Sequence, residues 1–182
     1  MAEALEPALP RHIDELTQQV LRKACDRDLC LATAESCTGG LLASLLTDIP
    51  GMSHAFERGF VVYTNEAKHE LLGVSNEILD NDGAVSERAA RAMAEGAIAH
   101  SHADAAISIT GFTEGGPGQP AGLVHFACAL REGQTTHREM RYGDLGRAKV
   151  RIAALETALA MLLEQLAEDA APAAVAATGG RP

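Results

Sequence analysis

Short apolar runs alternate with segments of helical periodicity along most of this chain of 182 residues. The helical segments are those at 11–26, 41–51, 65–73, 87–103 and 144–168. The runs typical of strands are those at 30–35, 55–64 and 104–111, with two more inside 123–142 that are joined by a turn at 131–134. Helices that alternate with short buried strands can cover both faces of one sheet. We therefore expect an α/β fold, a three-layer α/β/α sandwich with a mixed, mostly parallel sheet.

Residues suited to helix ends mark several of these boundaries. Thr64, Ser75 and Ser86 each precede a helical segment, where a hydroxyl can accept a hydrogen bond from an N–H group of the first turn. Gly73 is expected to end the helix at 65–73, and Pro50 with Gly51 the helix that begins at 41.

The chain is expected to form one domain, over residues 11–168, without internal repeats. Residues 1–10 are short and contain proline, so we expect a flexible N-terminus. Residues 169–182 are rich in Ala, Pro and Gly and lack periodicity, which predicts a disordered tail.

The net charge of -10 and the pI near 5.1 argue against binding to nucleic acid or to anionic membranes, both of which require a basic surface. A small phosphorylated ligand is still compatible, because a few local donors can hold one phosphate. No basic stretch followed by an apolar run marks a signal peptide, and no apolar run reaches the roughly 18 residues that span a bilayer. We expect a cytoplasmic protein.

Four cysteines are present and none forms a C-x-x-C pair or a zinc-ligand spacing. Cys25, Cys30 and Cys128 are expected to be free thiols that act as small core side chains. We expect neither a metal nor a cofactor. Cys37 is the cysteine whose position suggests chemistry.

Two expected strands end in polar or glycine-rich turns. One turn reads "ESCTGG" (35–40), and the other begins at Thr110 and Gly111 in "TGFTEGGPG". If the two strands are neighbours, their turns meet at the edge of the sheet where α/β proteins bind ligands. Ser36, Cys37 and Thr38 stand at the expected start of a helix, whose N–H groups favour negative charge.

Three interpretations of the first turn stay open. Ser36 or Thr38 could cap the helix, the N–H groups could hold an anion, or Ser36 could be a nucleophile whose oxyanion they stabilise. A Cys37 nucleophile, with a pKa lowered by the helix start, needs a histidine base. His54, His69 and His125 are candidates, but nothing in the sequence ties one of them to Cys37.

A serine nucleophile also needs a base, and Lys68 could supply it. It falls early in its helix with Leu72 four residues on, so its stem can lie against the apolar face, and partial burial would lower its pKa. Tyr63 ends the preceding strand, from which its hydroxyl could reach the turns. The alternative is a solvated Lys68 and a Tyr63 that packs in the core.

Together these blocks resemble the CinA C-terminal domain family over about residues 28–165. The resemblance rests on "AESCTGGLLASLLTDIPGMSHAFERGFVVYTNEAKHELLGV", "GAVSERAARAMAEGA", "ADAAISITG" and "YGD". It implies an α/β/α fold and, for a stand-alone member, hydrolysis of the carboxamide of nicotinamide mononucleotide without a metal. It also suggests a homodimer and a small-molecule nucleotide as the partner.

The resemblance places the nucleophile at Ser36, with Tyr63 and Lys68 in proton transfer. Substrate or oxyanion binding is expected from Cys37, Thr38, Gly39, Gly40, Thr110, Gly111 and Arg147. Two stretches depart from the family pattern. The loop at 111–122 carries Phe112 and Glu114 where active members have a glycine-rich run, and Leu145 stands where an arginine is usual. A non-catalytic nucleotide-binding or interaction module with the same fold is therefore the alternative.

Overall fold

The computed structural model describes residues 9–168. The expected disordered tail and residues 1–8 of the expected flexible N-terminus lie outside the described residues. Along the chain the elements are α1 (Arg11–Asp26), β1 (Leu31–Glu35), α2 (Leu41–Thr47), the 3-10 turn η1 (Ser53–Ala55), β2 (Phe56–Val61), α3 (Asn65–Leu72), α4 (Asn76–Asn81), α5 (Glu87–Ala99), β3 (Ala105–Gly111), β4 (Leu123–Leu130), β5 (Thr136–Arg141) and α6 (Arg147–Glu168).

The strands form one five-stranded sheet in the order β2-β1-β3-β4-β5. β1 pairs in parallel with β2 and with β3, whereas β4 is antiparallel to both β3 and β5. β4 is thus the strand that runs against the other four. The expected mixed, mostly parallel sheet is confirmed, with the hairpin of β4 and β5 at one edge.

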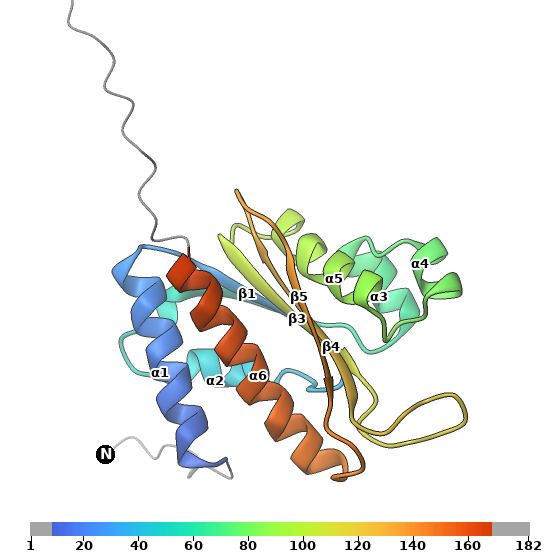
Figure 1. Cartoon of the computed structure of the whole chain (residues 1–182). Helices are drawn as coiled ribbons and strands as arrows, with labels where there is room; N and C mark the ends of the chain where they lie inside the picture. The colour runs from blue at the N-terminus through green and yellow to red at the C-terminus, as the bar shows by residue number, and fades with distance from the viewer. Residues whose placement is uncertain (1–8, 169–182) are drawn as a thin grey trace, which may run out of the picture.

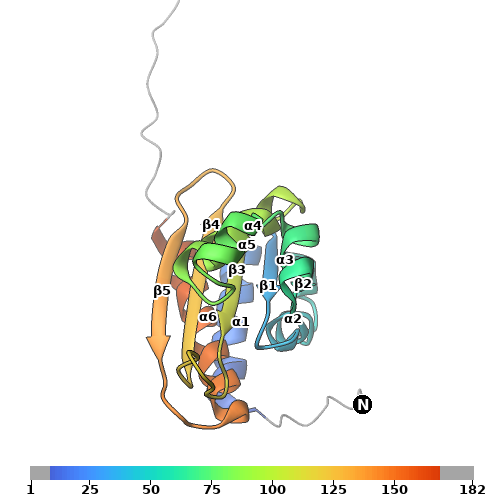
Figure 2. The same ribbon diagram turned by 90° about the vertical axis from the view of Figure 1, so that its right-hand side faces the viewer.

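Helices cover both faces of the sheet. α1, α2 and α6 pack on one face, and α3, α4 and α5 lie on the other (Figures 1 and 2). Leu21, Leu46, Ile107 and Leu159 belong to the fully buried core of the first face. On the second face the core is made largely of small residues, among them Ala90, Ala94 and Ala127, which let α5 lie close to the strands. Among the described helices, none has both the length and the apolar character needed to cross a membrane.

Most expected helix boundaries are confirmed. The hydroxyls of Thr64, Ser75 and Ser86 accept hydrogen bonds from the N–H groups of Ala67, Ile78 and Ala89. Gly73 ends α3 in the left-handed conformation. Three helices are shorter than expected: α2 ends at Thr47, before Pro50, α5 ends at Ala99, and α6 begins at Arg147.

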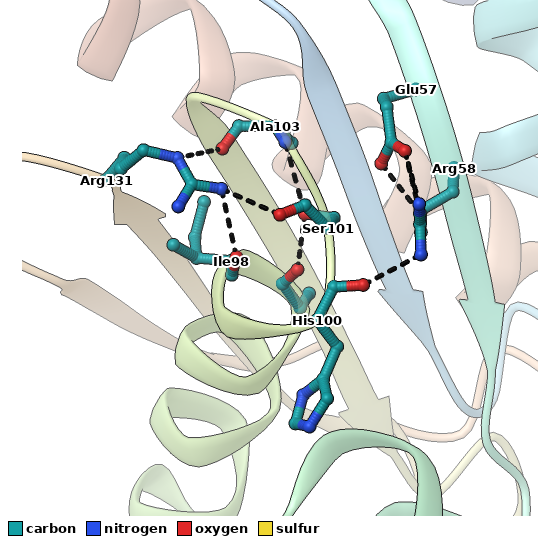
Figure 3. Close-up of polar contacts among 8 residues, drawn as sticks. Glu57, Arg58, Ile98, His100, Ser101, Ala103 and Arg131 are labelled. Atoms are coloured by element: carbon teal, nitrogen blue, oxygen red, sulfur yellow. Dashed lines mark hydrogen bonds and ion pairs between the residues drawn. The ribbon is translucent and has the colours of Figure 1, made fainter.

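Two arginines hold the connection between α5 and β3. The guanidinium of Arg131 donates to the carbonyl oxygens of Ala103, Ile98 and Ser101, each at 3.0 Å (Figure 3). Arg58 donates to the carbonyl oxygen of His100 at 2.8 Å. The connection precedes β3, so it lies at the end of the sheet opposite the two glycine-rich turns. The two arginines therefore stabilise the start of β3, away from the two turns.

Candidate active site

The two glycine-rich turns lie side by side. β1 ends at Glu35, its parallel neighbour β3 ends at Gly111, and Glu35 is opposite Ile109 in the register. The N–H group of Ser36 continues the pairing by donating to the carbonyl oxygen of Ile109 at 2.9 Å. The expectation that neighbouring strands bring these turns together is confirmed.

Glu35, and neither Ser36 nor Thr38, caps α2. Its carboxylate is fully buried and accepts hydrogen bonds from the N–H groups of Gly40, Leu42 and Ala43 at 3.0, 3.2 and 2.8 Å. The interpretation that a hydroxyl of the turn caps this helix is therefore wrong. A carboxylate at a helix start satisfies the free N–H groups and complements the helix dipole.

The chain reverses at two glycines so that the helix start faces this carboxylate. Gly39 and Gly40 have φ of 63° and 90°, a conformation that side chains disfavour. The Gly39 N–H donates to the carbonyl oxygen of Ser36 at 3.2 Å, and that of Gly40 donates to Glu35. Two of the four expected anion donors are thus engaged within the turn. The N–H groups of Cys37 and Thr38 donate to no other described residue.

Lys68 reaches from α3 to the hydroxyl of Ser36. Its Nζ lies 3.2 Å from Ser36 Oγ and also donates to the carbonyl oxygens of Val62 at 3.0 Å and Tyr63 at 3.4 Å. The Lys68 side chain is 1% exposed, so the solvated alternative is wrong. Burial away from water lowers the pKa of Lys68, as expected from its position in the sequence.

Cys37 is buried beside Ser36, and its environment differs from the expectation. Burial raises the pKa of the Cys37 thiol to about 11, an effect that exceeds the opposite influence of its backbone N–H. The expected lowering of this pKa is wrong, because α2 begins at Leu41 and its first N–H groups point at Glu35. The thiol lacks a histidine partner within the described residues: His69 binds the carbonyl oxygen of Val74, and His125 binds His137.

Tyr63 points away from the core, with 66% of the residue exposed, so the core alternative is wrong. Arg147, the first residue of α6, forms an ion pair with Glu114, in which Nη2 and Oε2 are 2.9 Å apart. Beside these residues is a cleft of about 220 Å³, lined by Tyr63, Gly111, Phe112, Thr113, Glu114, Gly115, Gln119 and Arg147.

Thr110 and Gly111 differ in what they present to this region. The buried hydroxyl of Thr110 donates to the carbonyl oxygen of Ala84 at 2.7 Å, which ties β3 to the segment before α5. Gly111 follows it, and the Phe112 N–H donates to Leu123 on β4. Since successive residues of a strand turn their N–H groups to opposite neighbours, that of Gly111 faces β1, the strand that ends beside Ser36.

Gly111 also has no room for a side chain. A Cβ atom there would lie 2.8 Å from the carbonyl oxygen of Leu123 and 2.9 Å from the Cα of Val124. Glycine is therefore required where the two strands approach each other.

Two residues, Glu35 and Arg151, contribute to the turn in ways that the sequence did not predict. Nη2 of Arg151 donates to the carbonyl oxygen of Thr38 at 2.6 Å, which ties α6 to the turn. The signal for Arg151 was its place one helical turn after Arg147. For Glu35 the signal was an acid just before a glycine pair. Among residues 9–168, no group of three or more His, Cys, Asp or Glu side chains is placed to hold a metal ion.

Comparisons with known proteins agree on one family. The family model described as the CinA C-terminal domain matches residues 13–166. The nicotinamide-nucleotide amidohydrolase PncC of Escherichia coli K12 is 44% identical over 85% of this chain and 95% of its own length. A solved competence/damage inducible protein from Agrobacterium tumefaciens superposes with a TM-score of 0.84 at 45% identity, over 87% of this chain and 98% of that one.

Other relatives are longer. A CinA-like protein of Akkermansia muciniphila is 44% identical, but the matched part is 36% of its length, and for a putative competence-damage inducible protein of Symbiobacterium thermophilum it is 28%. The chain thus spans about a third of the length of such relatives. The family model's match over residues 13–166 includes both turns, Lys68 and nearly all of α6. The protein belongs to the CinA C-terminal domain family.

Proposed function

We propose that this protein is an amidohydrolase that converts nicotinamide mononucleotide, or a close relative, into the corresponding carboxylate and ammonia. The observation that carries the proposal is the buried contact of Lys68 Nζ with Ser36 Oγ at 3.2 Å. A hydroxyl beside a buried amine is a nucleophile with its own base. The relative of similar length named for nicotinamide-nucleotide hydrolysis supports the choice of substrate.

The proposed reaction begins with Lys68 in its neutral form. The amine accepts the proton of the Ser36 hydroxyl while Oγ attacks the carbon of the carboxamide. As the tetrahedral intermediate collapses, the C–N bond breaks and the new ammonium of Lys68 returns the proton to the departing nitrogen. A water molecule then attacks the ester on Ser36 while Lys68 takes its proton. The bond between Oγ and the acyl carbon breaks, and Lys68 returns the proton to Oγ, which releases the carboxylic acid and restores the neutral amine. A lowered lysine pKa suits both halves of this cycle.

The oxyanion requires donors close to Ser36 Oγ. The N–H groups of Cys37 and Thr38 follow the nucleophile directly, and that of Gly111 faces β1. We propose these three as the donors, since the N–H groups of Gly39 and Gly40 are engaged within the turn. Donors held rigidly around a developing charge lower the barrier without having to reorganise.

The substrate's phosphate is proposed to bind in the cleft beside Arg147. Tyr63, which is largely exposed, lines the same cleft as Arg147. A planar guanidinium binds phosphate through two parallel hydrogen bonds. Because Tyr63 lines this cleft and is exposed, we propose that it contacts the substrate. We propose that Thr110 holds β3 in place through its bond to Ala84.

The test is a product assay. The protein is incubated with nicotinamide mononucleotide, and ammonia and the pyridine carboxylate are measured separately. The proposal expects both products in equal amounts. As a matched control, Ser44→Ala, at an exposed serine on α2, should retain the full rate. If neither product rises above an enzyme-free blank, the amidase proposal fails for this substrate.

One observation favours the alternative of a binding module without turnover. Glu114 already occupies Arg147, the guanidinium proposed to bind the phosphate. Binding of the mononucleotide measured by calorimetry, without either product in the assay above, would support the module over the amidase.

A further inference from the structure

We propose that Glu114 is an internal competitor for the phosphate site, occupying the guanidinium of Arg147 in the free protein until a mononucleotide displaces it. This rests on the proposed function, because it takes the phosphate of a mononucleotide as the group that binds Arg147. It assigns a role to Glu114, which lies in the loop between β3 and β4.

Glu114 binds the edge of the Arg147 guanidinium to which a phosphate would bind. Glu114 Oε2 lies 2.9 Å from Nη2 of Arg147, and Oε1 lies 3.4 Å from Nε. A phosphate forms the same two-pronged contact with arginine. Both oxyanions cannot occupy this edge at once, and a carboxylate left beside a phosphate would repel it.

The carboxylate is positioned so that it can leave. The side chains of Glu114 and Arg147 are 59% and 51% exposed, so the pair lies at the mouth of the cleft and not in a packed core. Gly115 and Gly116 follow Glu114 in the loop between β3 and β4. Backbone hydrogen bonds hold this loop on either side of Glu114: Phe112 with Leu123 and with Gly122, and Gly116 with Gln119. Rotation of the Glu114 side chain into water therefore leaves the loop intact.

The pair is weak enough to be displaced. Exposed ion pairs hold their partners only slightly, since water and salt screen both charges. A phosphate dianion carries more charge than a carboxylate and offers more acceptor oxygens. Glu114 would thus weaken the binding of every ligand that needs Arg147. A phosphate ester can displace the carboxylate, whereas a ligand without phosphate cannot.

The test uses ribose 5-phosphate, which carries the phosphate and the sugar but no amide, so its binding is independent of any amidase activity. Glu114→Gln keeps the shape and the hydrogen bond but removes the charge. Calorimetry should show that Glu114→Gln binds ribose 5-phosphate about fivefold more tightly than the wild type does. The gain arises because the variant has no ion pair with Arg147 to break before the phosphate binds. The gain should shrink as salt is added.

The matched control is Glu164→Gln. Glu164 forms an ion pair of 2.7 Å with Arg138, away from the cleft, and its replacement changes the net charge by the same amount. This variant should bind ribose 5-phosphate as the wild type does. Introducing Glu114→Gln into an Arg147→Met background should give little or no gain.

Three results would overturn the inference. One is equal or weaker binding by Glu114→Gln. The second is an equal gain in Glu164→Gln or with Arg147 absent, either of which would indicate a general effect of charge. The third is no binding of ribose 5-phosphate by any variant, because the cleft would then not be a phosphate site. Absence of amidase activity with tighter binding by Glu114→Gln would sink the proposed function and leave this inference standing.

Discussion

The Nζ atom of Lys68 lies 3.2 Å from Oγ of Ser36, in a contact that is almost closed to water. The two residues come from different elements, α3 and the turn after β1. The same Nζ donates to the carbonyl oxygens of Val62 and Tyr63. These carbonyls fix the amine at the end of β2, so its position relative to the serine is set by the sheet.

Replacing Lys68 should affect the chemical step more than binding. Lys68→Met fills the same space without a proton acceptor, and loss of a general base lowers kcat by about a hundredfold or more. The KM for nicotinamide mononucleotide should change by about threefold or less, because Lys68 faces Ser36 and not the cleft. Lys23→Met, on α1, is the control. Wild-type turnover in Lys68→Met would remove this lysine from the mechanism.

The pH profile should report the same group. Burial lowers the pKa of Lys68, and the neutral amine is the active form. The kcat/KM should therefore rise with pH and level off below the range of an ordinary lysine, near 10.5. A rising limb centred at or above that value would contradict a buried base.

Stability should depend on pH through the same residue. The folded state lowers the pKa of Lys68, so between this pKa and that of the unfolded chain the unfolded state binds more protons. Below the pKa of Lys68 in the folded state, the loss of folding stability caused by burying this amine is complete. The loss declines as pH rises between the folded and unfolded pKa values, and it is absent above the unfolded pKa. Urea unfolding at several pH values should show the wild type gaining stability relative to Lys68→Met as pH rises. A constant difference would contradict this.

Glu35 should matter for stability as well as for the turn. Glu35→Ala leaves three N–H groups at the start of α2 without their acceptor, which should lower the free energy of unfolding by about 2–4 kcal/mol. Glu35→Gln should lower the free energy of unfolding by less, since its amide oxygen can still accept a hydrogen bond from one of these N–H groups. Glu70→Ala, at an exposed position on α3, should change stability by about 0.5 kcal/mol or less. If Glu70→Ala lowered the free energy of unfolding as much as Glu35→Ala does, the hydrogen bonds of the buried Glu35 carboxylate would not be the cause of the loss.

The thiol of Cys37 should be unreactive in the folded protein. With its pKa raised to about 11, little thiolate is present at pH 8. Alkylation by iodoacetamide, followed for the Cys37 peptide by mass spectrometry, should be about a hundredfold slower than in urea. Labelling at the same rate in folded and unfolded protein would contradict the burial of Cys37.

Much of the fold could be predicted because local signals and tertiary structure agree. The hydroxyl caps at Thr64, Ser75 and Ser86 act within one helical turn, so the sequence alone identifies them. The sequence left open whether β1 and β3 are neighbours, because a five-stranded sheet allows several strand orders, and their parallel pairing supplies this condition.

The parts that sequence reasoning missed depend on contacts across the fold. Glu35 leaves a strand, and its carboxylate caps a helix that starts six residues later, which no capping pattern describes. The pKa of Cys37 depends on how completely its surroundings exclude water. Arg151 binds a carbonyl more than a hundred residues away, a pairing that periodicity cannot reveal. Each depends on tertiary packing, which local propensity does not encode.

The most direct measurement is the rate of ammonia release from nicotinamide mononucleotide by Ser36→Ala and Cys37→Ala, side by side with the wild type. We predict that Ser36→Ala loses at least about a thousandfold in rate, since among residues 9–168 Ser36 carries the hydroxyl that contacts Lys68 Nζ. Cys37→Ala should keep its rate within about tenfold, because its part is backbone donation and packing. Turnover retained by Ser36→Ala and lost by Cys37→Ala would contradict the assignment of Ser36 as the nucleophile.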